Sequence, residues 1–252
     1  MDLHARRADS FGAQARAYAE HRPDYPVAAI RWALEPLGSA ERLDVLDLAA
    51  GTGKLTAGLV AEGHRVTAVE PNEQMLSELV RRVHDVRALP GHAEHIPVPD
   101  GTVDAVFVGT AFHWFDQSKA LPEIARVLRP GGVLAAMWIE QDNSSAEWLA
   151  EFEQVSASSV ESRRGDPTGV MTHPLFGPVE QKTFPHAYRR ESPEALVAAT
   201  NTYSRMLVID DEERAAINEK MLAFLRERPE TSNGPFDVPL RSEVFRMVRV
   251  SD

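Results

Sequence analysis

Residues 45–56 read VLDLAAGTGKLT, and the turn of small residues in this stretch is the first place where the sequence suggests chemistry. An apolar run precedes the turn and an amphipathic pattern follows it, which predicts a strand, a tight turn and a helix. Backbone N–H groups at such a helix start point at a ligand, and small side chains allow a close approach. We therefore treat residues 49–53 as a candidate ligand-binding turn.

Two phosphate-binding motifs fail on this turn. The triphosphate loop has the pattern Gly-x4-Gly-Lys-Ser/Thr, and alignment on Gly53-Lys54 places leucine at both other positions, Leu48 and Leu55. The dinucleotide pattern Gly-x-Gly-x-x-Gly, started at Gly51, requires a third glycine where Thr56 stands. The turn therefore carries neither motif.

An acidic residue, Glu70, ends the next predicted strand. A carboxylate at this position accepts hydrogen bonds from the hydroxyl groups of a ribose. Together with a turn that lacks both phosphate motifs, this acid indicates a nucleoside that bears a group other than phosphate. The alternative is that Glu70 serves only as an acid at a helix start, beside Pro71 and Asn72, where the helix dipole favours negative charge.

Composition narrows the class of partner. The 252 residues carry a net charge of −11, so the chain as a whole repels nucleic acid and anionic membrane surfaces. The absence of cysteine excludes disulfides, thiolate nucleophiles and cysteine-ligated zinc. No apolar run approaches the roughly 20 residues that span a bilayer, and the N-terminus lacks the apolar core of a secretory signal. We expect a cytoplasmic protein that acts on a small molecule, as a monomer or homodimer.

Between residues 43 and 140, short apolar runs alternate with helical patterns. The predicted strands are 43–48, 65–70, 86–89, 103–108 and 133–139, and the predicted helices are 54–62, a segment capped by Asn72, and 118–128. The helix after Asn72 is expected to bury Met75, Leu76, Leu79 and Val80. Strand–helix alternation with short turns favours right-handed crossovers and a parallel, doubly wound α/β sheet.

The two flanks differ from this central pattern. Residues 1–40 suggest one or two helices, interrupted at residues 22–26 by Pro23 and Pro26. Residues 141–252 suggest further helices with strands at 180–190 and 238–250. The stretch between the last two strands is much longer than the roughly 2–6 residues of a typical connection, so we expect a helical lid there. The expected organisation is a single domain, with a helical cap at 1–40, a binding core at 41–140, and substrate-side helices, lid and C-terminal strands at 141–252.

Five short motifs occur in order along the chain: Asp47–Gly53, Val69–Asn72, Gly91–Asp100, Val103–Val108 and Leu128–Leu134. With these motifs the sequence resembles the class I S-adenosylmethionine-dependent methyltransferases across essentially its whole length. The segment Phe11–Pro26 and the run Ala111–Phe115 are similar to a bacterial, type 11-like branch that includes trans-aconitate methyltransferases. The resemblance implies a Rossmann-like, mostly parallel sheet of seven strands with the last antiparallel, and S-adenosylmethionine as cofactor.

The resemblance also implies a set of cofactor contacts: Tyr18, Arg22, Ala49, Gly51, Thr52, Gly53, Glu70, Pro71, Met75, Ala93, Glu94, Thr110 and Ala111. Glu70 is expected to accept hydrogen bonds from both ribose hydroxyls. His92 or Glu94 is expected near the adenine amino group. Tyr18 and Arg22 are candidates for the carboxylate of the cofactor, because an arginine fork matches a carboxylate.

Several of these positions have a structural alternative. Met75 also fits a core position, and residues 22–26 also fit a purely structural turn. Ala49 replaces the first glycine of the family motif, and Asp47 is expected to order the turn rather than to touch the cofactor. We expect no metal site, because residues 92–95 include histidine and glutamate without cysteine or a helical His-x3-His spacing.

The run Ala111–Phe115 supplies most candidates on the substrate side. The resemblance places His113 beside the reactive sulfur, where it would act as a base or contact the substrate. Phe112 and Trp114 are candidates for a pocket mouth, although aromatic residues usually pack in the core. Arg205, on the expected lid, would pair with an acidic substrate; the alternative is a solvated surface arginine.

The activity implied by the resemblance is in-line transfer of a methyl group to a small molecule. The attacking atom is oxygen, nitrogen or carbon, with carboxylates and natural products among the candidates. Such a displacement depends mainly on holding the two reactants in line, so few catalytic groups are needed. Two alternatives are a fold relative that binds S-adenosylmethionine and catalyses a different reaction, and a binding protein without catalysis. The presence of Glu70, Gly51 and Gly53 argues against the second alternative.

Overall fold

The computed structural model describes residues 14–38, 41–160 and 172–250. Phe11 and part of the predicted cap at 1–40 lie outside the described residues. The chain divides into two compact units. Unit 1 comprises residues 1–23, 140–164 and 185–241, and unit 2 comprises residues 24–139, 165–184 and 242–252.

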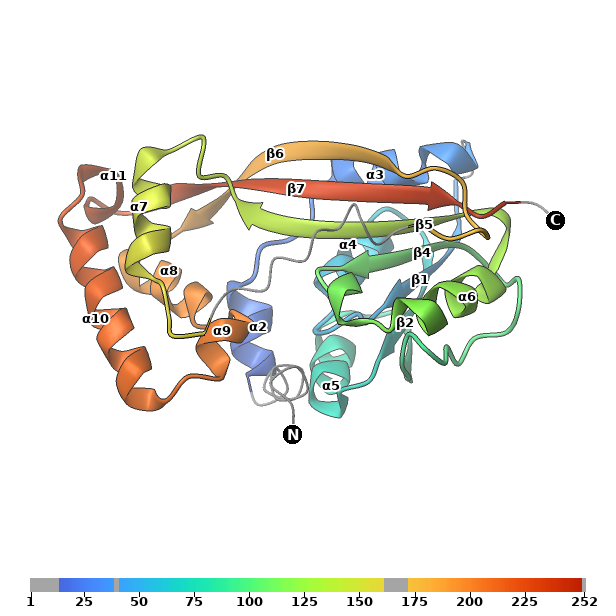
Figure 1. Ribbon diagram of the computed structural model, residues 1–252, viewed down its shortest axis with the longest axis horizontal. Helices are drawn as coiled ribbons and strands as arrows, with labels where there is room; N and C mark the ends of the chain where they lie inside the picture. The colour runs from blue at the N-terminus through green and yellow to red at the C-terminus, as the bar shows by residue number, and fades with distance from the viewer. Residues whose placement is uncertain (1–13, 39–40, 161–171, 251–252) are drawn as a thin grey trace. The chain divides into compact units, whose positions relative to one another are not determined.

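The described strands form one seven-stranded sheet in the order β3-β2-β1-β4-β5-β7-β6. Their bounds are β1 (Asp44–Leu48), β2 (Arg65–Glu70), β3 (Arg87–Pro90), β4 (Val103–Gly109), β5 (Leu128–Gln141), β6 (Glu180–Arg190) and β7 (Phe236–Val248). The pairs from β3 through β5 are parallel. Figure 1 shows β7 running opposite to its neighbours. The predicted doubly wound sheet with an antiparallel last strand is confirmed.

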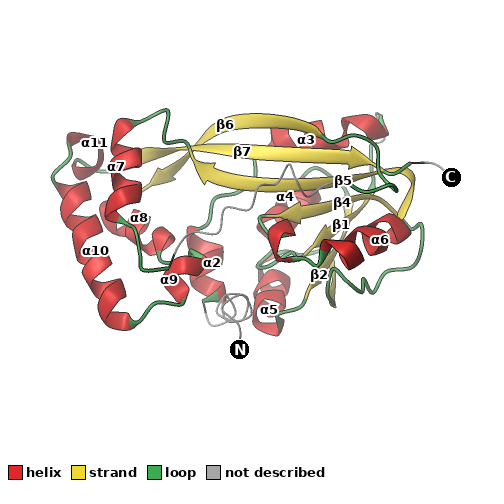
Figure 2. Cartoon of the chain, in the orientation of Figure 1, coloured by secondary structure: helices red, strands yellow, loops and turns green. Residues whose placement is uncertain are grey.

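Helices connect these strands, as Figure 2 shows by colour. Their bounds are α2 (Ala15–His21), α3 (Val27–Leu34), α4 (Lys54–Ala61), α5 (Glu73–Arg82), α6 (Gln117–Val127), α7 (Glu147–Val155), α8 (Pro193–Thr200), α9 (Ser204–Leu207), α10 (Asp211–Arg226) and α11 (Pro229–Ser232), with short 3-10 helices η1 (Glu35–Leu37) and η2 (Phe112–Trp114). Among the helices in the described ranges, none combines the length and apolar character needed to cross a bilayer.

Helix α5 illustrates how local sequence sets these bounds. The Asn72 side chain accepts hydrogen bonds from the backbone N–H groups of Gln74 and Met75, at 3.0 and 3.1 Å, which satisfies donors at the helix start. Met75 and Leu79 are buried as expected. The expectation for Val80 is wrong, because its side chain is 52% exposed on the solvent side of the helix.

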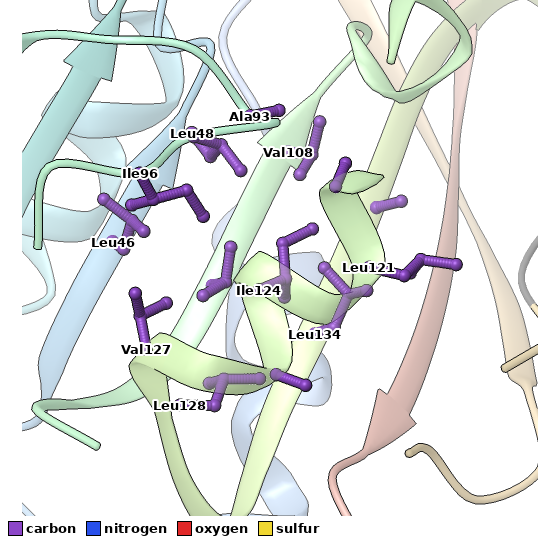
Figure 3. Close-up of a cluster of buried hydrophobic side chains, with 14 of the residues drawn as sticks. Leu46, Leu48, Ala93, Ile96, Val108, Leu121, Ile124, Val127, Leu128 and Leu134 are labelled. Carbon is purple, nitrogen blue, oxygen red and sulfur yellow. The ribbon is translucent and has the colours of Figure 1, made fainter. Parts of the chain in front are cut away.

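The core of unit 2 consists of two apolar clusters built from alternate residues of the same strands. Leu46 and Leu48 of β1 belong to one cluster, with α6 residues such as Ile124; Figure 3 shows side chains of this cluster. Val45 belongs to the other cluster, with residues of α3 and α4 such as Leu59. Because successive side chains of a strand point to opposite faces, β1 is buried on both faces.

Unit 1 has its own apolar contacts. The Trp148 ring of α7 lies 6.0 Å from the Phe236 ring, and the Phe152 ring lies 6.1 Å from the Phe224 ring of α10. The Ser192 hydroxyl accepts from the Ala195 N–H at the start of α8, as the Ser-Pro-Glu pattern predicts. Unit 1 therefore contains α7, which precedes β6, and helices of the predicted lid region between β6 and β7.

Candidate functional site

The strand order places the 49–53 turn at a switch point of unit 2. Strand β1 has β2 on one side and β4 on the other, and all three strands run parallel. The turn after β1, Glu70 at the end of β2, and Thr110 directly after β4 therefore follow the carboxyl ends of three adjacent strands. Ligands of open α/β sheets bind in the crevice at such a point.

The turn itself has a left-handed backbone at three positions. The φ angles are 56° at Ala49, 57° at Gly51 and 84° at Gly53. Gly53 has a second constraint, because a Cβ atom there would lie 2.8 Å from the Leu79 Cγ atom. The Ala50 N–H donates to the Val69 carbonyl at 3.1 Å, which ties the turn to β2. The turn is thus held in place by its neighbours while its small residues leave room for a ligand.

Replacement of Ala49 by glycine is expected to stabilise the protein by about 1 kcal/mol. A left-handed conformation costs a residue with a Cβ atom roughly 1–2 kcal/mol, and the greater unfolded-state entropy of glycine offsets part of this gain. The free energy of unfolding, measured with urea, tests this. Ala50→Gly is the matched control, since Ala50 is not among the positive-φ residues. It is expected to destabilise the protein, and equal effects of the two substitutions would contradict the argument.

Glu70 links the turn to the start of α5. Its side chain is 7% exposed, and its two oxygens accept from the backbone N–H groups of Gly51 and Asn72, at 2.9 and 3.0 Å. Burial raises the pKa of Glu70, and the two N–H groups oppose that increase by favouring the ionised form. A carboxylate offers about four acceptor positions, so two remain for a ligand. The structural and the ligand-binding interpretations of Glu70 are therefore compatible.

Asp47 is buried beneath the turn. The Thr56 hydroxyl donates to one Asp47 oxygen at 2.5 Å, while the other oxygen, Oδ1, has no partner among the described residues. Burial raises the pKa of Asp47 to about 7. The Thr52 hydroxyl is also buried without a partner in the described part of the chain. An unsatisfied hydroxyl in the turn fits a polar ligand that lies against it.

Tyr25 completes the geometry at the end of β4. Its hydroxyl lies 2.9 Å from the Thr110 hydroxyl, and Thr110 has a φ angle of 54°. A Cβ atom at Gly109 would lie only 2.6 Å from the Tyr25 hydroxyl oxygen, so glycine is needed for this approach. Asp24 pairs with Lys54 at 2.9 Å, and the Lys54 side chain is 15% exposed. The ion pair ties the start of α4 to the residue that precedes Tyr25.

Comparison with known proteins identifies the family of this site. Residues 46–136 match a family model described as a methyltransferase domain. An uncharacterized methyltransferase of Schizosaccharomyces pombe is 31% identical over 224 residues, which cover 86% of this chain and 87% of that protein. The chain belongs to the methyltransferase family. With its sheet order and cofactor motifs, it is a class I S-adenosylmethionine-dependent methyltransferase.

A further relative and a solved structure support membership of the same family. An uncharacterized methyltransferase of Mycobacterium tuberculosis is 46% identical over 158 residues, which cover 63% of this chain and 61% of that protein. The chain thus spans about three fifths of the length of that relative. A solved protein described as a type II methyltransferase from Anaeromyxobacter dehalogenans has a TM-score of 0.70 and 26% identity, over 90% of this chain and 97% of that one.

S-adenosylmethionine is the cofactor of this family, and the turn residues fit it. The glycine turn permits a close approach, the buried Thr52 hydroxyl has no partner among the described residues, and Glu70 retains acceptor positions. On the adenine side, Ala93 is 4% exposed, and the Glu94 carboxylate accepts from the Asp116 N–H at 2.8 Å. Glu94 therefore also positions the start of α6, whereas His92 is exposed.

Two other predicted cofactor neighbours differ in exposure. Pro71 is exposed, whereas Met75 is 4% exposed and packs within unit 2, which supports the core interpretation of Met75.

Residues 92–95 form a narrow loop closed by a bridge between His92 and His95. Within the part of the chain that the structure describes, no three His, Cys, Asp or Glu residues are grouped so that they could hold a metal ion.

His113 lies on η2 of this methyltransferase, in contact with two tryptophans. The Trp138 indole N–H donates to the His113 Nδ1 atom at 3.5 Å, and the Trp114 ring lies 4.8 Å from the imidazole. An imidazole that accepts at Nδ1 carries its proton on Nε2 when neutral, and its single lone pair is then engaged. This geometry favours a substrate contact over a general base. Phe112 is 1% exposed within the core, which favours packing for its side chain.

The remaining predicted residues belong to unit 1, whereas the glycine turn belongs to unit 2. Arg22 lies over the rings of Tyr18 and Tyr203, at 4.8 and 4.1 Å from the ring centres. Arg205 donates to the Ser156 carbonyl, and to the Ser156 hydroxyl at 3.1 Å, at the end of α7. Arg205 is therefore not a solvated surface arginine, and its predicted substrate role stays a prediction.

Sequence reasoning missed Tyr25 and Lys54 as parts of this site. Tyr25 lies in the proline-rich segment that interrupted the predicted N-terminal helices, and only a tyrosine between two prolines marked it. Its partner Thr110 is 85 positions away in the chain. No local pattern reports a contact of that separation, so only the folded structure could show it.

Proposed function

We propose that this methyltransferase transfers the methyl group of S-adenosylmethionine to a small-molecule acceptor by in-line displacement. The observation that carries the proposal is the arrangement at Glu70. A buried carboxylate at the end of β2 binds the Gly51 N–H of the turn and retains acceptor positions for the two ribose hydroxyls. The net charge of −11 supports a small molecule over nucleic acid as acceptor.

Each part of the cofactor has proposed partners in the chain. The turn residues Ala49, Gly51 and Gly53 lie against the methionine portion through their backbone, with Thr52 supplying a hydroxyl. The Ala93 N–H and either His92 or Glu94 bind the adenine. Bound S-adenosylmethionine supplies an electrophilic methyl group on a positively charged sulfur.

In this proposal the chain contributes to catalysis mainly by positioning the acceptor, and less by acid–base chemistry. Thr110 and Ala111, at the end of β4, border the acceptor, and the hydrogen bond between the Tyr25 and Thr110 hydroxyl groups fixes the Thr110 side chain. His113 contacts the acceptor through a ring whose orientation is set by Trp138. Methyl transfer to a carboxylate requires no base. For such an acceptor, holding the attacking atom in line with the methyl–sulfur bond is therefore sufficient for catalysis.

Methyl-labelled S-adenosylmethionine tests this proposal directly. The purified protein is incubated with the labelled cofactor and a panel of small carboxylic acids, amines and phenols. The expected result is label in an acceptor and an equal amount of S-adenosylhomocysteine. Product formation without label in it would favour a non-methylating reaction instead. Cofactor binding in a calorimeter without any turnover would favour a binding protein and contradict the proposal.

A further inference from the structure

Two arginines of unit 1 lie close together without a carboxylate partner among the described residues. Arg190 is the last residue of β6 and is 8% exposed. Arg22 follows α2 directly. The ion pairs within the described ranges include neither residue, although several other arginines have carboxylate partners. An arginine that is nine-tenths buried is normally paired, because an isolated buried charge is costly.

Backbone carbonyls and aromatic rings hold the two guanidinium groups. Arg190 donates to the His21 carbonyl at 3.0 Å and lies 4.3 Å from the centre of the Tyr188 ring. Arg22 donates to the Thr202 carbonyl at 3.0 Å and lies over the rings of Tyr18 and Tyr203. Each arginine has five N–H donors, and in each the buried Nε–H has no acceptor among the described residues. The two side chains are thus fixed in position with donors left over.

The electrostatics of the pair are unfavourable as they stand. Burial lowers the pKa of Arg190, and the positive charge of Arg22 lowers it further, while Tyr188 and Tyr203 oppose this. Arg190 is buried and Arg22 is partly buried. Two cations near each other repel, and neither is neutralised by a described residue. A bound anion would satisfy the unused N–H donors and remove the repulsion. A carboxylate suits the guanidinium fork, since its two oxygens match two parallel N–H groups.

We propose that Arg190 and Arg22 form a binding site for a small carboxylic acid within unit 1. This inference goes beyond the proposed methyl transfer and does not depend on it. The same chemistry has a second source, since the methionine part of the cofactor also carries a carboxylate, for which Arg22 is a sequence-based candidate. The experiment below separates the two sources.

The test measures two affinities for each variant by titration calorimetry. One is for S-adenosylmethionine, and the other is for succinate and citrate as carboxylate probes, with dimethyl succinate as the uncharged comparison. The variants are Arg190→Gln and Arg190→Lys, which preserve hydrogen bonding or charge and so limit misfolding. Arg189→Gln is the matched control, because Arg189 neighbours the site in sequence but is 58% exposed and pairs with Asp237.

The expected result is that wild type and Arg189→Gln bind at least one carboxylate probe and not the ester. Arg190→Gln should weaken that binding at least tenfold, with a smaller loss for Arg190→Lys, while the affinity for S-adenosylmethionine stays within twofold. An equal loss for the cofactor would assign the site to the cofactor carboxylate and overturn the proposal. Failure of wild type to bind either probe would also overturn it.

Discussion

Glu70→Ala is expected to weaken S-adenosylmethionine binding by about 1–3 kcal/mol, or roughly 5- to 150-fold in the dissociation constant. The substitution removes the acceptor for the ribose hydroxyls. It also leaves the Gly51 and Asn72 N–H groups, now held at 2.9 and 3.0 Å, without their partner. Titration calorimetry measures the dissociation constant, and far-ultraviolet circular dichroism checks that the variant is folded.

Two further variants sharpen the interpretation of this result. Glu70→Gln keeps one acceptor oxygen and the side-chain shape, so its loss of affinity should be intermediate. Glu73→Gln, in the exposed first turn of α5, changes a nearby charge without touching the turn and should leave the affinity unchanged. An unchanged dissociation constant in Glu70→Ala would refute the ribose role, whatever happens to stability.

Asp47→Asn is expected to remove a large pH dependence of stability. The pKa of Asp47 is raised from 3.8 to about 7 in the folded protein, so the folded state holds this proton more tightly than the unfolded state. The resulting stabilisation is fully present below about pH 4 and is lost as the pH rises to about 7. The difference between the two pKa values corresponds to roughly 4 kcal/mol.

Urea denaturation at several pH values measures this effect. The free energy of unfolding of the wild type, minus that of Asp47→Asn, should fall by up to that amount between pH 4 and pH 7. Asparagine can still accept the Thr56 hydroxyl, which makes it a conservative replacement. The raised pKa of Glu70 contributes a slope of the same sign to both proteins. Parallel curves for the two proteins would contradict a raised pKa at Asp47.

The central sheet could be predicted from the sequence because its signals are local. Each buried strand between residues 43 and 108 is a short apolar run bounded by turn residues, and the observed β2 coincides with the predicted 65–70. Strand β5 differs, since it begins at Leu128 rather than at 133. A Pro-Gly-Gly sequence is typical of a turn, but here it lies within the strand, at the point where the pairing register with β4 shifts.

The site could be predicted only where its residues form a pattern that is local in the sequence. The turn and Glu70 lie at the ends of adjacent strands, so a pattern of strand, turn and acid was enough to find them. Arg190 gave no such signal, because a single arginine at the end of a strand usually faces solvent. Its burial depends on α2, whose His21 carbonyl is 169 positions away in the chain. The same limit applies to Ala49, because an alanine in the sequence does not indicate a left-handed backbone.

The position of β7 in the sheet governs how the chain completes its fold. Strand β6 is at the sheet edge and neighbours only β7, which is the last strand in sequence. Until residues 236–248 have been synthesised, β6 has no partner in this sheet and β5 has one open edge. Unpaired edges can join edges of other molecules. The final strand closes both edges at once, so a chain cut short before it would aggregate through β5 and β6.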